Sequence, residues 1–162
     1  MPFELRPYPT PTLLPEGAYL QTEWEQSVYP LAALMGVQIR LPAVSPQPYT
    51  RLAFEGLEFA KEHGGGDDYH SNVMRAFFQR GEDIGNPEVL TRVASAAGLN
   101  AEAFRNALDG QTYAGRTGDL LRYASERVRV EGVPLFLIGD TRLSGLQSRR
   151  TLEAVIERQL RA

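Results

Sequence analysis

The sequence predicts an α/β domain in which a large helical insertion separates the segments that build a small sheet. Strand-like patterns occur only near the two ends of the chain, residues 50–130 have the periodicity of amphipathic helices, and the chain closes with one more such helix. A chain of 162 residues is long enough to bury one core. We therefore expect residues 1–162 to form a single domain, with the helical insertion over residues 50–130.

Residues 1–49 are expected to hold a strand, two proline-rich linkers and a helix. Pro2–Pro7 alternates apolar and polar residues, as a short strand does. Tyr8–Pro15 carries three prolines, which favours an extended linker, although such a stretch can also be a ligand for an aromatic-lined groove. Gly17–Met35 has helical spacing, which Pro30 is expected to kink or divide, and the second proline-rich linker follows.

Residues 50–130 read as a series of helices. Thr50 is expected to cap the first helix, which Gly64–Gly66 ends. Asn86 and Asn100 are expected to cap two later helices, and another helix over residues 120–128 completes the block. The second helix carries an apolar stripe that is expected to face the core and not a cofactor: Tyr69, Val73, Met74, Phe77 and Phe78.

Residues 131–162 are expected to form a strand hairpin and a final helix. Pro134–Ile138 is a continuous apolar run that ends at Gly139-Asp140, a pattern typical of a buried strand and a tight turn. Thr141–Ser144 is the expected partner strand. The last segment places four apolar residues on one helical face, which is expected to pack on the sheet: Leu152, Val155, Ile156 and Leu160.

The composition argues against several classes of protein. With 17 basic and 20 acidic residues, the chain lacks the clustered positive charge typical of nucleic-acid binding. Its apolar runs fall far short of the roughly 20 residues that span a bilayer. Its first residues also lack the basic-then-apolar pattern of a signal peptide. We expect a cytoplasmic protein with no nucleic-acid and no membrane partner.

The sequence contains no cysteine, which removes disulfides, thiolate metal sites and cysteine nucleophiles together. His63 and His70 have no second ligand at a spacing that indicates a metal, and ordinary surface or half-buried histidines are the commoner case. No pattern ties Ser144 or Ser148 to a His–Asp pair. We expect no metal, no cofactor and no catalytic residue within this chain.

Two short motifs lie near the C-terminus: Gly132–Ile138 and, after the turn, Leu143–Gln147. They resemble the end of the DsbA family, close to its FrnE-like branch. Further stretches that are similar to this family are Pro2–Pro7, Ser45–Leu52 and the segment from Tyr69 to Phe78, so that the resemblance covers nearly the whole chain. It implies a thioredoxin-like (DsbA-type) fold with a helical insertion, in the family of thiol–disulfide oxidoreductases.

The same resemblance implies a set of substrate-binding residues. Pro134 is expected to follow a cis peptide bond, with the backbone of Val133 exposed beside a groove, where an extended ligand can bind. Composition alone leaves Pro134 an ordinary trans residue at a strand start. Gln147 belongs to the turn of the second motif. Arg6 is expected either to meet a substrate carboxylate or to be a solvated arginine at a strand end.

The sequence departs from the family pattern at its start. In the resembled family a strand and a helix with a Cys-x-x-Cys precede the equivalent of Pro2–Pro7, and neither has a counterpart here. We therefore expect the sheet to be incomplete at the N-terminus. Either a partner chain covers the uncovered apolar surface, the remaining strands close the gap, or the natural protein starts upstream of Met1.

Two classes of function remain open for the chain. One is the oxidoreductase family, with this cysteine-free chain itself unable to catalyse disulfide exchange, or the related glutathione-dependent isomerases of hydroxychromene carboxylates. The other is a non-catalytic module that binds a peptide or a small molecule.

The incomplete sheet predicts a homodimer, because an unpaired strand edge is a template for pairing. The contact is expected near Phe3, Leu5, Phe136 and Ile138. The alternative is a monomer whose N-terminal strand pairs with Leu135–Ile138.

Overall fold

The computed structural model describes residues 1–161, which fall into two compact units. The first, which we call the helical unit, contains Pro2 and residues 4–119. The second, the hairpin unit, contains Met1, Phe3 and the described residues from Leu120 onward. All strand residues that the structure describes lie after residue 134, which confirms the helical insertion. No described helix is long and apolar enough to cross a bilayer.

The strand expected over Pro2–Pro7 is wrong. This segment is irregular, and it turns locally: the Thr10 amide donates to the Pro7 carbonyl (2.8 Å), and the Arg6 guanidinium donates to the Pro11 carbonyl (3.3 Å). A strand needs a neighbouring strand for its backbone groups, and proline supplies no donor. Alternation of apolar and polar residues is therefore not sufficient to form a strand in this segment, and Leu5 is 69% exposed.

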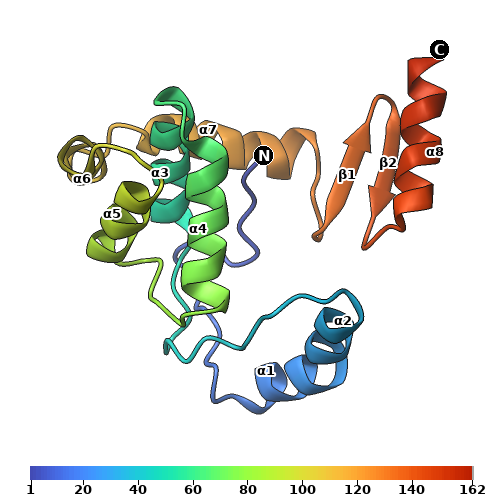
Figure 1. Cartoon of the computed structure of the whole chain (residues 1–162), viewed down its shortest axis with the longest axis horizontal. Coiled ribbons are helices and arrows are strands. Elements are labelled where there is room, and N and C mark those ends of the chain that lie inside the picture. Colours follow the sequence, from blue (N-terminus) through green and yellow to red (C-terminus); the bar gives the residue numbers. More distant parts are fainter. Residues whose placement is uncertain (162) are drawn as a thin grey trace. The chain divides into compact units, whose positions relative to one another are not determined.

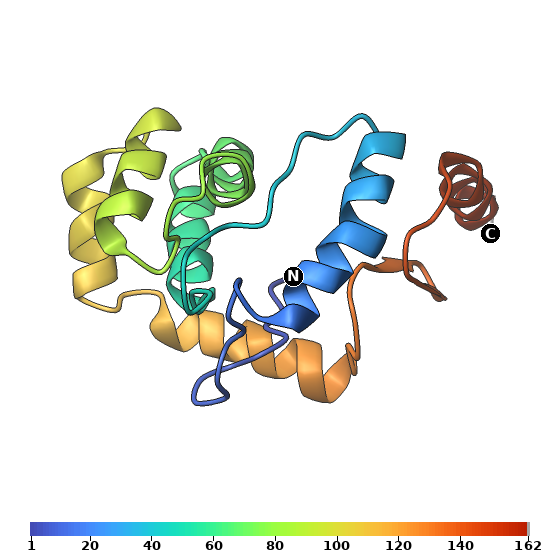
Figure 2. The ribbon, with the colours of Figure 1, turned by 90° about the horizontal axis from the view of Figure 1, so that it is seen from below.

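Pro30 divides the first helical segment, as expected. Helix α1 (Ala18–Glu23) continues into a π-helical turn, η1 (Trp24–Val28), and then into α2 (Tyr29–Leu34), as one rod in Figure 2. A proline has no backbone N–H for the regular helical hydrogen bond, and a wider turn accommodates the missing donor. The rod is attached through Trp24, whose ring lies 5.4 Å from that of Tyr29 and 6.1 Å from that of Phe78.

The core of the helical unit is built from α3 (Arg51–Glu62), α4 (Gly66–Phe78), α5 (Pro87–Ala96) and α6 (Ala101–Asp109), and α7 (Ala114–Arg122) follows. Helix α3 packs on the other three core helices (Figure 1). The buried apolar residues form one cluster: Ala53, Phe59, Ala60, Tyr69, Val73, Ala76, Ile84, Leu90, Val93, Ala94, Leu99, Phe104, Leu108 and Tyr113.

The core helices approach closely at Gly56 of α3. A Cβ atom on Gly56 would lie 2.3 Å from the Tyr69 hydroxyl oxygen of α4 and 2.7 Å from the Phe104 ring of α6. Both distances are shorter than carbon atoms tolerate, so only glycine lets the three helices meet at this point.

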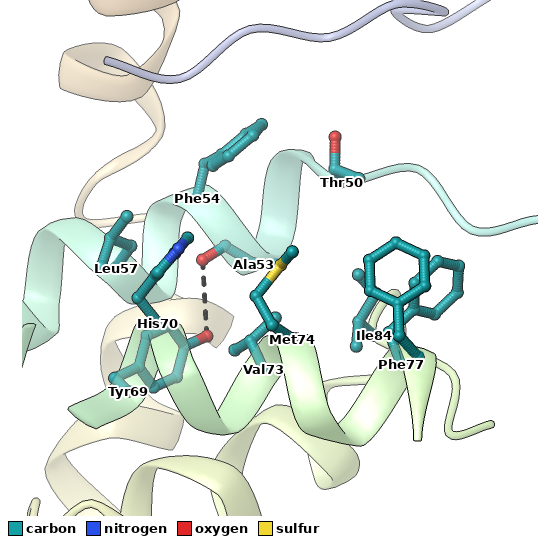
Figure 3. Close-up of a pocket in the computed structure, with 11 residues that line it drawn as sticks. Thr50, Ala53, Phe54, Leu57, Tyr69, His70, Val73, Met74, Phe77 and Ile84 are labelled. Carbon is teal, nitrogen blue, oxygen red and sulfur yellow. Dashed lines mark hydrogen bonds between the residues drawn. The ribbon is translucent and has the colours of Figure 1, made fainter. Parts of the chain in front are cut away.

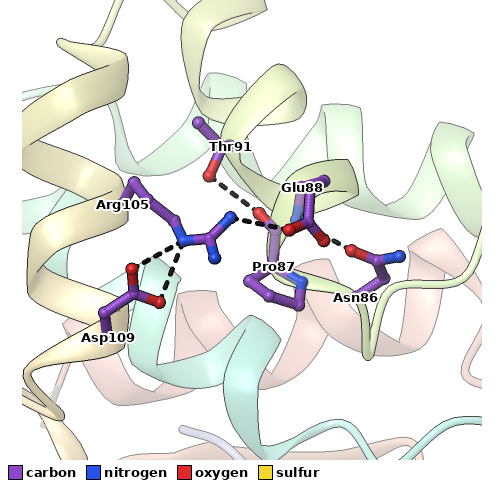
Figure 4. Close-up of polar contacts among 6 residues, drawn as sticks. All are labelled: Asn86, Pro87, Glu88, Thr91, Arg105 and Asp109. Atoms are coloured by element: carbon purple, nitrogen blue, oxygen red, sulfur yellow. Dashed lines mark hydrogen bonds and ion pairs between the residues drawn. The ribbon is translucent and has the colours of Figure 1, made fainter.

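The two asparagine caps are confirmed. Asn86 Oδ1 accepts from the Glu88 amide and Asn100 Oδ1 from the Ala103 amide, each at 2.8 Å. Arg105 of α6 then bridges Asp109 (2.8 Å) and Glu88 at the start of α5 (2.9 Å), as Figure 4 shows. The hydrogen bond from Arg105 lowers the pKa of Glu88. Caps and ion pairs together hold α5 and α6 side by side.

The cap expected of Thr50 is wrong. Thr50 makes no side-chain hydrogen bond to the first turn of α3, and its hydroxyl donates instead to Glu4 Oε1 at 3.3 Å. The Arg51 amide also donates to the Glu4 carboxylate, so a residue distant in sequence supplies the acceptor. Burial raises the pKa of Glu4, and these hydrogen bonds and the charge of Arg51 offset that effect only in part.

The hairpin unit contains the expected strand pair. After the π-helical turn η2 (Tyr123–Arg127), β1 (Leu135–Ile138) pairs antiparallel with β2 (Thr141–Ser144), with Phe136 opposite Leu143. Gly139 in the turn has φ of +58°, a conformation that favours glycine.

Helix α8 (Arg149–Leu160) lies along the hairpin (Figure 1). Gln159 donates to Asp140 and Arg158 to Thr141, each at 2.6 Å. The packing face expected of α8 is only partly right. Leu152 and Val155 are half-buried, but Ile156 is exposed and Leu160 is 81% exposed. The two-stranded hairpin is too narrow to cover the whole apolar face of a twelve-residue helix.

Replacing Gly56 should test this close contact in the core. Gly56→Ala is expected to lower the free energy of unfolding by about 1–3 kcal/mol, because the added carbon overpacks the junction. Gly115→Ala in α7 is the control, since open space surrounds that position, and it should raise stability by about 0.5–1 kcal/mol. Urea unfolding measures both, and equal effects of the two substitutions would contradict the assignment.

The partly buried Glu4 carboxyl should make stability depend on pH. As pH rises from the ordinary pKa of 4.5 toward the raised value, the unfolded chain ionises before the folded one. The contribution of Glu4 to the free energy of unfolding therefore falls as pH rises. Glu4→Gln keeps an acceptor for Thr50 but cannot ionise, so this loss of stability with rising pH should disappear. The free energy of unfolding of the variant minus that of the unmodified chain should therefore be more positive at pH 7 than at pH 4. Glu23→Gln, an exposed change of the same charge, is the control.

Candidate functional site

The first candidate site is the turn that leads into β1. The Val133–Pro134 peptide bond is cis, and the residue Val133 is 56% exposed. The Gly145 amide donates to the Pro134 carbonyl at 2.9 Å, which holds the turn against the end of β2. Among the described residues no backbone hydrogen bond involves Val133. Val133 is thus an exposed residue beside a turn that a hydrogen bond holds in place.

Gln147 supports the same turn from the other side. Its Nε2 donates to the carbonyls of Ser144 (2.8 Å) and Gly145 (3.2 Å). Gly145 in turn holds Pro134, so Gln147 acts on Val133 and Pro134 by positioning the loop that contacts them. The amide nitrogen is already used, and only its oxygen is left for a ligand.

Arg6 is not brought to these residues by any described contact. It belongs to the helical unit, and its guanidinium is exposed and donates to the Pro11 carbonyl. Of the four residues that the resemblance implies, the structure thus gathers Val133, Pro134 and Gln147 in the hairpin unit.

The second edge of β1 continues this site. Strand β1 pairs with β2 on one side, and no other described strand pairs with it. Leu137 in the middle of β1 is 49% exposed. An open strand edge presents alternating N–H and C=O groups, which is the surface that an extended chain adds to. Val133 and this edge together can hold a peptide in extended form.

The titratable chemistry near this turn includes no thiol. The sequence has no cysteine, so this chain supplies no thiolate near Val133. The described residues contain no group of three or more His, Asp or Glu side chains that could hold a metal ion.

A second candidate site was not expected from the sequence. Helices α3 and α4 line an apolar cavity of about 160 Å³ in the helical unit, which is partly open to solvent (Figure 3). Tyr69 and Val73 of the predicted stripe are buried in the core, as expected, and also line the cavity, but Met74 of the same lining is 45% exposed. The remaining lining residues are Thr50, Ala53, Phe54, Leu57, His70, Phe77, Phe78 and Ile84.

Two rows of side chains on α4 form this wall of the cavity. Tyr69 and Val73 are buried between the cavity and the core, while His70 and Met74, one position later along the helix, line the cavity and are exposed. An i, i+4 pair of histidine and methionine beside an aromatic stripe was the signal that could have revealed it. The Tyr69 hydroxyl donates to the Ala53 carbonyl at 3.4 Å, and burial raises the pKa of Tyr69.

Comparison with known proteins agrees with the resemblance drawn from the sequence. The profile of the DSBA-like thioredoxin domain matches residues 2–157. The chain is also 43% identical over 157 residues to the uncharacterized protein YwbO of Bacillus subtilis (strain 168), an alignment that covers 96% of this chain and 78% of the relative. The α/β, thioredoxin-like fold class with a helical insertion is thereby confirmed. The chain belongs to the DSBA-like thioredoxin domain family.

Proposed function

We propose that this chain is a member of the FrnE-like branch of the thiol–disulfide oxidoreductase family, and that its 162 residues bind an extended peptide without exchanging disulfides. This proposal rests on one observation: the sequence matches the DSBA-like family but contains no cysteine. The motifs around Gly132–Ile138 and Leu143–Gln147 support the branch.

The chemical half of the proposal follows from the mechanism of disulfide exchange. Exchange begins with attack of a thiolate on a disulfide sulfur, and it proceeds through a mixed disulfide. The sulfur atoms of this chain belong to three methionines, whose thioethers do not attack disulfides. Binding can take place without a thiol, because it needs only surface and hydrogen-bonding groups.

The binding half rests on the hairpin unit. The exposed residue Val133 and the open edge of β1 present hydrogen-bonding groups in sequence, and the exposed Leu137 adds apolar surface. Peptides that add to a strand edge gain affinity from main-chain hydrogen bonds and specificity from alternate side chains. Gln147 keeps the turn in place. Arg6 is a candidate contact for a peptide carboxylate, as the resemblance implies.

The purified chain should have no disulfide exchange activity. Insulin reduction by dithiothreitol is expected to proceed at the rate of the buffer control, because the chain offers no thiolate. Turnover above that control by a homogeneous sample would contradict the proposal.

Peptide binding should depend on the backbone of Val133. The probe is dye-labelled, S-carboxymethylated insulin B chain, which is extended and has no free thiol, with fluorescence anisotropy as the readout. Val133→Pro removes one N–H donor and is expected to raise the dissociation constant by up to about tenfold. Val133→Ala keeps the donor and should change binding less. Equal binding by both variants and the unmodified chain would place the peptide elsewhere.

We also propose that the open edge of β1 pairs two copies of the chain when no peptide is bound. Phe136 and Ile138 are half-buried, whereas Leu137 between them is 49% exposed. We therefore propose that the contact between the two copies uses the edge of β1 and the Leu137 side chain. Sedimentation at micromolar concentration should detect a dimer. Leu137→Lys should weaken it, because a lysine on an edge strand opposes pairing. Leu34→Lys, at another exposed leucine, is the control, and a monomeric unmodified chain would defeat this proposal.

A further inference from the structure

We propose that the cavity between α3 and α4 is a binding site for a small, uncharged phenol. The site lies wholly within the helical unit, and it is separate from the peptide site proposed for the hairpin unit. Its size, its apolar lining and the one polar group left at its mouth each point to this class of ligand.

The volume fits one six-membered ring. The cavity measures about 160 Å³. A protein cavity of about 150 Å³ with Leu, Ile and Phe walls stays dry and takes up benzene. A water molecule would find few partners there. The volume therefore suits a monocyclic molecule.

The lining favours an aromatic ring. Phe54 of α3 and Phe77 of α4 contribute aromatic side chains to the lining, and Met74 contributes a flexible thioether. Aromatic rings attract each other in edge-to-face and offset arrangements, and a thioether sulfur packs well against a ring. No charged side chain lines the cavity, so an ionised ligand would lose its hydration without compensation.

The polar groups of the cavity are satisfied within the protein, with one exception. The Tyr69 hydroxyl donates to the Ala53 carbonyl, and the Thr50 hydroxyl donates to Glu4. The remaining group is the His70 ring, which is exposed, points from α4 toward α3 in Figure 3, and has no hydrogen-bond partner among the described residues. A ring hydroxyl at the mouth of the cavity is the group that imidazole can bind.

The test uses the three methionines of the chain as reporters. The ε-methyl groups are labelled with carbon-13, and the protein is titrated with 4-methylphenol and, separately, with toluene. Met74 lines the cavity, whereas Met1 and Met35 lie outside it. We expect a saturable shift of the Met74 methyl signal with both compounds and no comparable shift of the other two. Equal shifts of all three signals, or none, would overturn the proposal.

Substitutions test separately how the apolar wall and the mouth of the cavity contribute to binding. Ala53→Leu fills the cavity and is expected to weaken binding of both compounds by about tenfold or more, whereas Ala103→Leu on the exposed face of α6 should leave it unchanged. Should Ala53→Leu fail to fold, Leu57→Trp at the half-buried wall replaces it, with the same expectation. Equal affinity of the filled and control variants would contradict the proposal.

His70→Ala should weaken binding of 4-methylphenol severalfold and leave toluene binding unchanged, since only the phenol has a hydroxyl. His63→Ala is the matched control, because His63 lies outside the cavity with its ring stacked on Phe59 and its Nδ1 within 2.8 Å of the Phe59 carbonyl. N-acetyl-phenylalanine amide serves as a competitor. If it shifts the Met74 signal at lower concentration than 4-methylphenol does, the cavity takes a peptide side chain and the proposal is wrong.

Discussion

The helical unit depends on the absence of a single side chain, at Gly56. Because α3 has no Cβ there, Tyr69 of α4 and Phe104 of α6 both reach its backbone, and both are almost completely buried. This contact fixes the rotation of α4 about its own axis. With Tyr69 buried against α3, His70 and Met74 line the outer part of the cavity beside it.

Burial is distributed unequally between the two units. The buried apolar side chains lie mostly in the helical unit, whereas in the described hairpin unit they are Ala124 and Val130. Regions with few buried contacts open at lower free energy than the core does. The helical unit therefore supplies most of the stability, and the proposed peptide site lies where the chain is least packed. Binding sites are commonly placed on such segments.

The sequence was most informative where the determinants of structure are local. The caps at Asn86 and Asn100, the division at Pro30 and the hairpin turn at Gly139 each depend on a few adjacent residues, and each was predicted. The errors concern groups that are distant in sequence. The Pro2–Pro7 strand needed a partner that the described chain does not supply, and Thr50 lost its capping role to Glu4, 46 positions earlier. The cavity was missed because its walls come from two helices.

The chain has a single tryptophan, and its location gives the molecule a built-in optical reporter. Trp24 is almost buried, and its ring neighbours are Tyr29 on its own helical rod and Phe78 at the end of α4. Its emission should therefore follow the docking of the α1–η1–α2 rod onto α4. The hairpin unit contains no indole, so tryptophan emission originates from the helical unit alone.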